Sequence, residues 1–229
     1  MNSQLITTAD GAHSLYVPAL NEHYHSVNGA VQESRHVFIE AGFRYSRQNT
    51  AHTPLRILEA GFGTGLNALL TWLEADRDHD GDHDSAGVYY EAIEKYPLPA
   101  DVVARLNYST VLGLPDNGRL ERLHSLPWER TTRLSPRFSL CKRCIDLRDY
   151  QPASRFDLIY FDAFAPDVQP DLWTEALFRT LYAGLYPGGA LVTYSAKGSV
   201  KTALRQAGFE LRRLQGAAGK RHMLRAVKP

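Results

Sequence analysis

The chain has 229 residues, 44% hydrophobic and 22% charged, with a formal net charge of +1. These are ordinary globular values, and the length suits one α/β domain with room for a small appendage. The small net charge argues against a globally basic nucleic-acid binder, although a local basic face would not show in the sum. No run approaches the ~18 apolar residues of a membrane span, and MNSQLITTADG at the start lacks a signal-peptide layout. With two cysteines we expect no disulfide framework, no membrane association and a cytoplasmic protein.

Apolar patterns and turn signals predict strands that alternate with helices. Asp10-Gly11 marks a hairpin between two strand-like runs, and residues 29–46 have helical spacing with an end expected near Gly42. After Pro54 the expected strands are 55–61, 87–94, 138–147, 155–164 and 189–195, with two more strands in the tail 209–228. The expected helices are 64–76, 98–108, 170–185 and 198–208.

This alternation predicts a mostly parallel, seven-stranded sheet with helices on both faces and an antiparallel C-terminal strand. We divide the chain into an N-terminal hairpin and helix extension, residues 1–53, and a main α/β domain, residues 54–229. DRDHDGDHDS, residues 76–85, looks like a calcium loop, but Gly87 stands where a bidentate Glu is needed, so we expect a polar connection. Cys141 and Cys144 have zinc-site spacing without a second cysteine pair, so we predict no metal site.

A glycine-rich turn, EAGFGTGLN (59–67), lies between the first strand and the first helix of the main domain. Ligands of open α/β sheets bind beyond the carboxyl ends of the strands, and glycines allow close approach to the backbone. The dinucleotide pattern fails because Leu66 stands three residues after Gly63, and the phosphate loop fails for lack of a Lys-Ser/Thr pair. The spacing E-x-G-x-G-x-G instead suits S-adenosylmethionine, which brings no phosphates. The cofactor candidates in this turn are Glu59, Gly61, Phe62, Gly63, Thr64, Gly65 and Asn67.

Acidic residues also follow three further strands. Glu94 is placed to accept hydrogen bonds from both ribose hydroxyls, and we group the adjacent Lys95 with it as a cofactor candidate. Asp146 follows the third strand, where an adenine amino group needs an acceptor. Asp162 ends the apolar run of the fourth strand and is a cofactor candidate as well. One such acid would be an ordinary loop residue, but acids at several strand ends around one glycine turn predict a cofactor site.

Several segments together resemble one methyltransferase family: HYHSVNGAVQESRHVFIEAG (23–42), EAGFGTGLNALLTW (59–72), EAIEKYPL (91–98), YFDAFAPDVQPDLWTEALF (160–178) and GKRHML (219–224). This family completes 5-methylaminomethyl-uridine at the tRNA wobble position, and in many bacteria it is fused to an FAD-dependent oxidase in the bifunctional MnmC protein. The resemblance implies a class I, Rossmann-like methyltransferase fold over 54–229, S-adenosyl-L-methionine as cofactor, and the tRNA anticodon stem-loop as partner. Because five residues follow Leu224, it also implies a stand-alone enzyme that receives its aminomethyl intermediate from a separate oxidoreductase.

The matching motifs imply a substrate side as well. The residues concerned are Tyr24, Glu33, Phe164, Pro166, Lys220 and Arg221. The chain departs from the family pattern at Ala163, commonly Gly, at Val168-Gln169, commonly Lys-Asn, and at His222, commonly Glu. These departures touch the acceptor contacts more than the cofactor site.

Asp162 is the catalytic candidate. Methylation of an amine needs a free lone pair, and a carboxylate beside the methyl group can orient the amine and stabilise the positive charge that develops on nitrogen. Phe164 is placed to stack on the uracil ring and Pro166 to stiffen the loop. From the residues alone, an Asp162 that caps the next turn and a Phe164 in the core stay open as alternatives. The candidates for phosphate contacts are Arg35, Arg44, Arg47, Lys197, Lys201, Arg205, Lys220 and Arg221.

Two other functions stay open at this point. A spermidine-synthase-like aminopropyltransferase uses a similar fold, glycine turn and strand-ending acid, with a decarboxylated cofactor and a polyamine acceptor. The motifs GKRHML and ESRHVFI favour tRNA, because a polyamine site calls for a more acidic pocket. The second alternative is a cofactor-binding module without catalysis that associates with a tRNA-modifying oxidase, and the presence of Asp162 argues against it.

Overall fold

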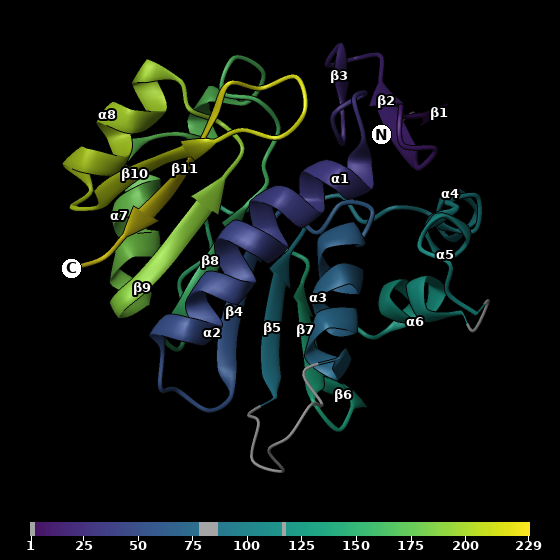
Figure 1. Cartoon of the computed structure of the whole chain (residues 1–229), viewed down its shortest axis with the longest axis horizontal. Helices are drawn as coiled ribbons and strands as arrows, with labels where there is room; N and C mark the ends of the chain where they lie inside the picture. Colours follow the sequence, from purple (N-terminus) through teal and green to yellow (C-terminus); the bar gives the residue numbers. More distant parts are fainter. Residues whose placement is uncertain (1–2, 78–86, 116–117) are drawn as a thin grey trace.

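The computed structural model describes residues 3–77, 87–115 and 118–229 (Figure 1). The loop predicted over 76–85 lies outside these ranges from residue 78 onward. A small antiparallel sheet opens the chain and a larger sheet forms the centre of the molecule. The strands of the small sheet are β1 (Gln4–Thr7), β2 (His13–Val17) and β3 (Glu22–His23). Its third strand was not predicted, since two residues carry no periodic signal.

The central sheet has the order β10-β11-β9-β8-β4-β5-β7-β6. Its strands are β4 (Leu55–Ala60), β5 (Val88–Ile93), β6 (Thr132–Ser135), β7 (Phe138–Arg143), β8 (Phe156–Phe161), β9 (Leu185–Thr193), β10 (Glu210–Gln215) and β11 (His222–Val227). Strands β7, β5, β4, β8 and β9 are parallel, whereas β11 runs antiparallel to β9. The predicted mostly parallel sheet with an antiparallel C-terminal strand is confirmed. The described sheet has one strand more than the seven predicted, because the short β6 folds back on β7 as a local hairpin.

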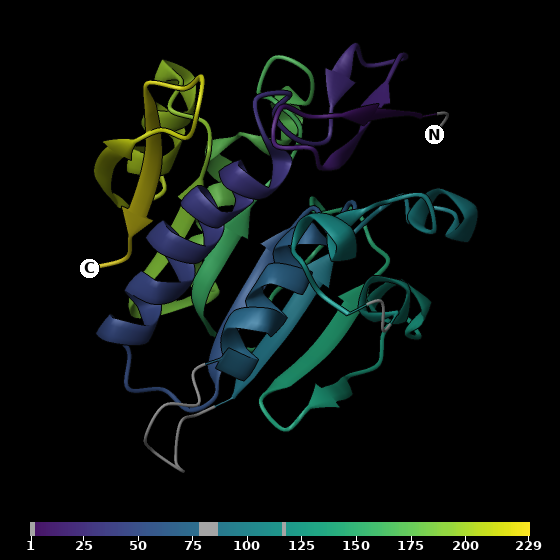
Figure 2. The same ribbon diagram turned by 45° about the vertical axis from the view of Figure 1, so that its right-hand side comes forward.

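One face of the sheet is covered by a long helix and by α3 (Leu66–Arg77), which lie side by side in Figure 2. The long helix runs through α1 (Ala30–Ser34), the π-helical η1 (Arg35–Arg44) and α2 (Tyr45–Asn49). The predicted helix end near Gly42 is wrong. A Cβ on Gly42 would lie 3.0 Å from Val192 and 3.1 Å from the Tyr160 ring, so this glycine lets the helix approach the sheet closely.

The opposite face is covered by α7 (Glu175–Ala183) and α8 (Gly198–Gln206). The helix predicted over 170–185 is interrupted: η2 (Pro170–Leu172) forms one 3₁₀ turn before α7. The interruption has a local cause, because the hydroxyl of Thr174 accepts a hydrogen bond from the Leu177 amide and starts a new helix.

The helix predicted over 98–108 is instead two short turns, α4 (Ala100–Val103) and α5 (Tyr108–Val111), followed by α6 (Arg119–Ser125). The side chain of Asn107 explains the break. It accepts from the His13 amide at 2.7 Å and donates to the Gly11 carbonyl at 2.9 Å, so it ties this segment to the N-terminal sheet. These contacts across the fold outweigh helix propensity.

All parallel strands end at one edge of the central sheet, next to the small N-terminal sheet (Figure 2). The glycine turn follows β4 there, and Glu94, Asp162 and Tyr194 directly follow β5, β8 and β9. Every helix in the described ranges is too short or too polar to cross a bilayer.

Candidate functional site

A cavity of about 700 Å³ opens at this edge of the sheet. Its walls come from the turns after the parallel strands and from the segment between β3 and α1. The predicted site residues that line it are Tyr24, Glu33, Gly61, Phe62, Gly63, Thr64, Asn67, Glu94, Lys95, Asp146, Asp162, Phe164 and Lys220. Four predicted residues lie outside the lining: Glu59, Gly65, Pro166 and Arg221. Glu59 and Pro166 are buried behind the wall, and Arg221 is exposed.

The glycine turn is held between β5 and β8. The Gly61 amide donates to the Ile93 carbonyl at 3.1 Å, and the Gly63 amide donates to Oε2 of Glu94 at 2.9 Å. Gly61 has a φ of +95°, and a Cβ there would lie 2.8 Å from the carbonyl oxygen of Asp162. Only glycine fits this position, because both the dihedral and the close approach exclude a side chain.

Thr64 anchors the next part of the turn. The Tyr108 hydroxyl donates to Oγ1 of Thr64, and the His124 ring donates to its carbonyl oxygen, both at 3.0 Å. Burial lowers the pKa of His124 to about 4 and the pKa of His25, which lies near the same hydroxyl, to about 4. Both rings are therefore neutral at physiological pH and act as fixed dipoles behind the turn.

Asn67 joins two carboxyl groups at the floor of the site. Its amide nitrogen Nδ2 donates to Oε1 of Glu59 at 3.0 Å and to Oδ2 of Asp162 at 2.8 Å. Burial raises the pKa of Glu59 well above its ordinary range and raises the pKa of Asp162 to about 7, against the bond from Asn67. With a pKa of about 7, Asp162 is divided between its acid and carboxylate forms near neutral pH.

We expect Asn67→Ala to lower the free energy of unfolding by about 1–3 kcal/mol, since two buried carboxyl groups lose their shared donor. Loss of this bond also raises the pKa of Asp162 further, because the bond favours the ionised form. Urea unfolding and the pH profile of activity measure the two effects. The exposed Asn49→Ala, on α2, is the control. Equal stability of the two variants, with an unshifted profile, would contradict the bridging role.

Two further acids line the wall after β5 and β7. Glu94 accepts from the amides of Gly63 and Tyr96, at 2.9 and 2.8 Å. Asp146 accepts from Nζ of Lys95 at 2.8 Å and from the Arg148 guanidinium at 2.6 Å. Arg148, reinforced by Lys95, holds the pKa of Asp146 well below its usual range, so this carboxylate stays ionised. Arg148 was not predicted, because its role depends on a turn that brings it back onto Asp146.

An aromatic pair forms the outer wall. The Tyr24 and Phe164 rings meet edge to face, with centroids 5.1 Å apart at 79°. Phe164 is half-buried and lines the cavity, so the structure places it at the site and not in the core. Its carbonyl accepts from Nε1 of Trp173 at 2.9 Å, which fixes the loop that carries it.

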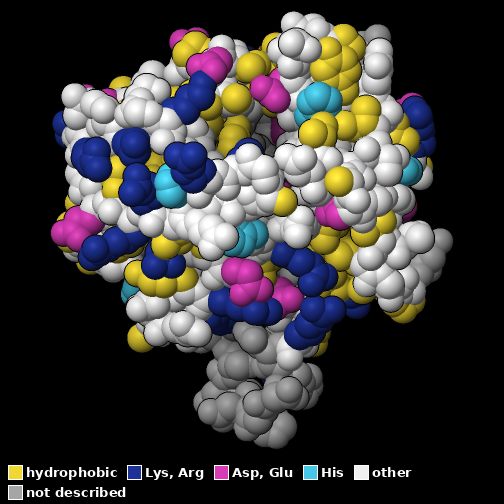
Figure 3. All heavy atoms as spheres, turned by 45° about the horizontal axis from the view of Figure 1, so that its top comes forward, with side chains coloured by type: hydrophobic (Ala, Val, Ile, Leu, Met, Phe, Trp, Pro, Cys, Tyr) yellow, Lys and Arg dark blue, Asp and Glu magenta, His cyan; other side chains and the backbone are white. Residues whose placement is uncertain are grey.

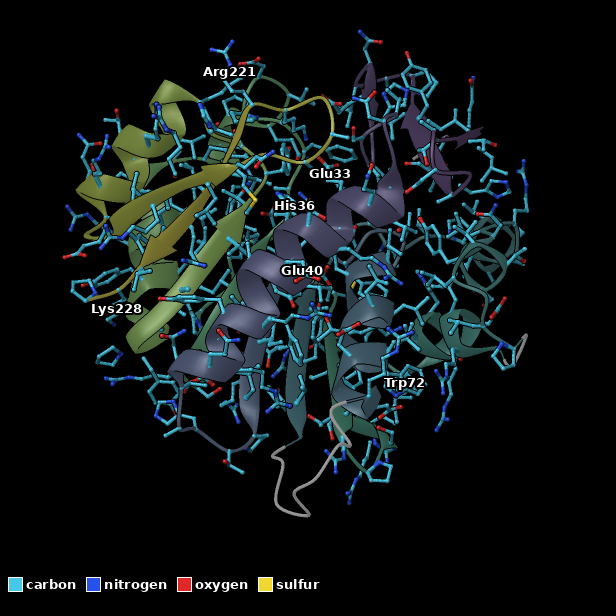
Figure 4. The ribbon with its side chains drawn as sticks, in the orientation of Figure 1. Glu33, His36, Glu40, Trp72, Arg221 and Lys228 are labelled. Carbon is cyan, nitrogen blue, oxygen red and sulfur yellow. The ribbon has the colours of Figure 1, made fainter. Side chains whose placement is uncertain are left out.

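A charged pair lies against a third aromatic residue. Nζ of Lys220 lies 2.6 Å from Oε1 of Glu33 and 4.0 Å from the centroid of the Tyr194 ring. Tyr194 in turn donates to the Ala163 carbonyl at 2.8 Å. Figure 4 shows Glu33 on the first turns of the long helix, whereas Arg221 points outward beyond the tail loop. Tyr194 was missed, although it follows β9 just as the predicted acids follow their strands.

Comparisons with known proteins show which family this chain resembles. Residues 121–229 match the family model described as S-adenosyl-L-methionine-dependent methyltransferase. A curated relative from Burkholderia thailandensis, named tRNA 5-methylaminomethyl-2-thiouridine biosynthesis bifunctional protein MnmC, is 33% identical over 235 residues, which cover 96% of this chain. The chain is therefore similar to S-adenosyl-L-methionine-dependent methyltransferases over residues 121–229, and over nearly its whole length to this MnmC relative. The alignment covers 34% of that relative, so this chain spans about a third of the relative's length.

A second relative agrees in sequence, and a solved structure agrees in fold. A protein of the same name from Paraburkholderia xenovorans is 31% identical over 218 residues, covering 91% of the methyltransferase and 32% of the relative. The crystal structure of MNMC2 from Aquifex aeolicus superposes with a TM-score of 0.78 at 24% identity, over 100% of this chain and 71% of that chain. The expected family, fold and cofactor class are confirmed. The aminopropyltransferase and the non-catalytic module are not favoured.

Proposed function

We propose that this methyltransferase transfers a methyl group from S-adenosyl-L-methionine to the primary amine of 5-aminomethyl-(2-thio)uridine at the wobble position of tRNA. The product is 5-methylaminomethyl-(2-thio)uridine. The observation that carries the proposal is the position of Asp162: its carboxyl group lines the cavity with the glycine turn and with the Tyr24–Phe164 pair. The curated relatives, which are named for biosynthesis of this nucleoside, support the choice of acceptor.

The residues present fit the cofactor. The cavity volume lies within the ~300–1,000 Å³ usual for small-molecule sites. Bare backbone at Gly61 and Gly63 would let the aminoacyl part come close, and we assign Glu94, which lines the cavity, to the ribose hydroxyls. We assign the wall at Asp146 and Lys95 to the adenine end.

Asp162 is the proposed acceptor of the proton that the substrate ammonium must lose. When bound, S-adenosyl-L-methionine would supply an electrophilic methyl group for the amine nitrogen, with its sulfur as the leaving group. An alkylammonium has a pKa of roughly 10, so the acceptor arrives mostly protonated and without a free lone pair. Asp162 takes one proton from this ammonium, and the acid later releases it to water. Asn67 holds the carboxylate in place during this exchange.

The aromatic and charged walls position the acceptor. We assign Tyr24 and Phe164 to the faces and edge of the uracil ring, since bases stack on aromatic side chains. We assign Glu33 to the aminomethyl side, where its pairing with Lys220 keeps it oriented. Pro166 stiffens the loop from behind.

We also propose the setting of the reaction. The N-terminal extension, residues 1–53, and the methyltransferase domain, residues 54–229, close the cavity together, because both contribute lining residues. The partners are the anticodon stem-loop of tRNA and an oxidoreductase that supplies the aminomethyl intermediate, as the bifunctional name of the relatives suggests. We place the protein in the cytoplasm, with its tRNA substrate.

One experiment tests the proposed reaction. Labelled S-adenosyl-L-methionine and tRNA that carries 5-aminomethyl-uridine are incubated with the protein, and the tRNA is digested to nucleosides. We expect label in 5-methylaminomethyl-uridine and none with a control tRNA whose wobble uridine is unmodified. Absence of the labelled nucleoside, under conditions in which the cofactor binds, would rule the reaction out.

A further inference from the structure

The C-terminal part of the chain is strongly basic although the whole chain is nearly neutral. Residues 197–229 contain nine of the 26 Lys and Arg but one of the 25 Asp and Glu, namely Glu210. Figure 3 shows Lys and Arg side chains gathered on the side of the molecule that carries the C-terminal strands. We call this surface the basic edge: Lys201 and Arg205 of α8, Arg212 and Arg213 of β10, Arg221 in the tail loop and Arg225 of β11.

Within the described ranges, these charges have no acidic partner. In the ranges that the structure describes, none of the six forms a salt bridge with an acid, whereas Arg44, Arg148 and Arg179 each do. A hollow lies between Tyr45 and the two last strands, and Arg212, Arg213 and Arg225 line it together with Glu210. The basic edge is thus a set of cations without an acidic partner in the described ranges, and three of them line a concave surface that also holds Glu210.

One pairing on the basic edge costs stability. Arg212 and Arg225 are directly opposite each other on antiparallel strands, and like charges in this position repel. Arg225 lies 3.6 Å over the Tyr45 ring, and its Nε is buried without a hydrogen-bond partner. An anion between the two guanidinium groups would remove the repulsion.

Protection of a sheet edge does not explain this arrangement. Strand β10 ends the sheet, and charged residues on an edge strand discourage pairing with other chains. Charges of either sign give this protection, and alternating signs give it without repulsion. An edge with six cations and one acid, Glu210, instead indicates a polyanionic partner.

The basic edge continues to the cavity. Strands β10 and β11 are joined by the loop 216–221, in which Lys220 lines the cavity and the next residue, Arg221, faces outward. We propose that the basic edge binds the phosphate backbone of the tRNA whose wobble uridine enters the cavity; this inference rests on the proposed function. Each phosphate that it contacts adds sequence-independent, salt-sensitive affinity.

The test uses Arg212→Gln/Arg213→Gln in the full chain, with Lys201→Gln/Arg205→Gln as an independent second variant. The matched control is Arg122→Gln/Arg130→Gln, which removes two exposed cations near α6, on the opposite flank of the sheet. We expect each test variant to weaken tRNA binding about tenfold and to reduce the slope of log K against log salt by about 2. The KM for tRNA rises accordingly, while kcat and the Kd for S-adenosyl-L-methionine stay the same.

Two outcomes overturn the inference while leaving the proposed function in place. One is wild-type methylation of tRNA with unchanged KM and salt slope in both test variants. The other is loss of binding to vesicles of phosphatidylserine, but not to tRNA, which would assign the basic edge to a membrane surface. Methylation of the free nucleoside 5-aminomethyl-uridine separates the two proposals: it should be unaffected by the variants, and its absence in the wild type would count against the proposed function.

Discussion

Asp162→Asn is expected to reduce methyl transfer by about 10²–10⁴-fold, the range typical for loss of a general base. The substitution keeps the shape of the side chain and an oxygen that still accepts the bond from Asn67, but it cannot take a proton from the acceptor. Cofactor binding should change by less than about tenfold, since the glycine turn and Glu94 are untouched. Initial rates with labelled S-adenosyl-L-methionine and the Kd for the cofactor measure the two quantities.

Asp167→Asn is the matched control for this prediction. Asp167 lies on the same loop, is exposed and pairs with Lys197, but it does not line the cavity. We expect it to retain wild-type turnover. If Asp162→Asn turned over as fast as Asp167→Asn, the carboxylate would have no role in the chemistry and would serve only to shape the turn.

The second large effect is the pH dependence of the wild-type enzyme. Burial raises the pKa of Asp162 to about 7, and the ionised form is the one that accepts a proton. We therefore expect kcat/KM to rise about tenfold per pH unit below pH 7 and to level off above it. A rise that continues toward pH 9 would show instead that the neutral amine is selected from solution and that Asp162 does not titrate in this range.

The same shift predicts how stability depends on pH. The pKa of Asp162 is higher in the folded protein, about 7, than its ordinary value of 3.8, so ionisation favours unfolding. The contribution of this group to wild-type stability is full below about pH 4 and is lost as pH rises to 7, by up to about 4 kcal/mol. The Asp162→Asn variant has no carboxyl group at this position, so it does not lose this stability as pH rises. Urea unfolding at pH 5 and pH 8 should show a stability advantage of the variant that is larger at pH 8.

The ionised form of Asp162 is thus expected to lower stability and to be required for activity. An ionised carboxylate at the end of β8 costs folding free energy because the surrounding residues remove part of its hydration. The same loss of hydration raises the pKa of Asp162 to about 7, in the pH range where an amine acceptor must be deprotonated. The loss of folding free energy on ionisation of Asp162 therefore accompanies the raised pKa that the proposed reaction needs.

Local sequence correctly predicted those cavity residues that directly follow a parallel strand. The glycine turn and the acids Glu94, Asp146 and Asp162 were all predicted as cavity residues, because parallel strands bring their carboxyl ends to one edge of the sheet. Tyr194 follows the same rule and was missed only because it is not an acid. The turn itself is specified by glycines that adopt positive φ, which is a local property.

Other features, such as the roles of Asn67 and Gly42, depend on contacts between segments that are distant in the sequence. Asn67 looks like part of a cofactor turn, but in the fold it bridges Glu59 and Asp162, 95 positions along the chain from the latter. Gly42 carries a helix-stop signal, yet it lies inside a helix because it faces the sheet. In both cases the contacting residues lie in or directly after strands of the central sheet, and no local sequence pattern encodes that contact.

By itself, the sequence predicted the fold class and the acids at the strand ends, since both depend on local periodicity and on residue types at turns, and its motifs carried the resemblance to a methyltransferase family. Only the tertiary structure decided that Phe164 lines the cavity, that Lys220 pairs with Glu33, and that Arg221 and Arg225 belong to a basic edge. The physical reason is that burial and charge pairing are properties of neighbours in space. Those neighbours are set by strand order and helix packing, which fix both the proton affinity of Asp162 and the free charges of the C-terminal strands.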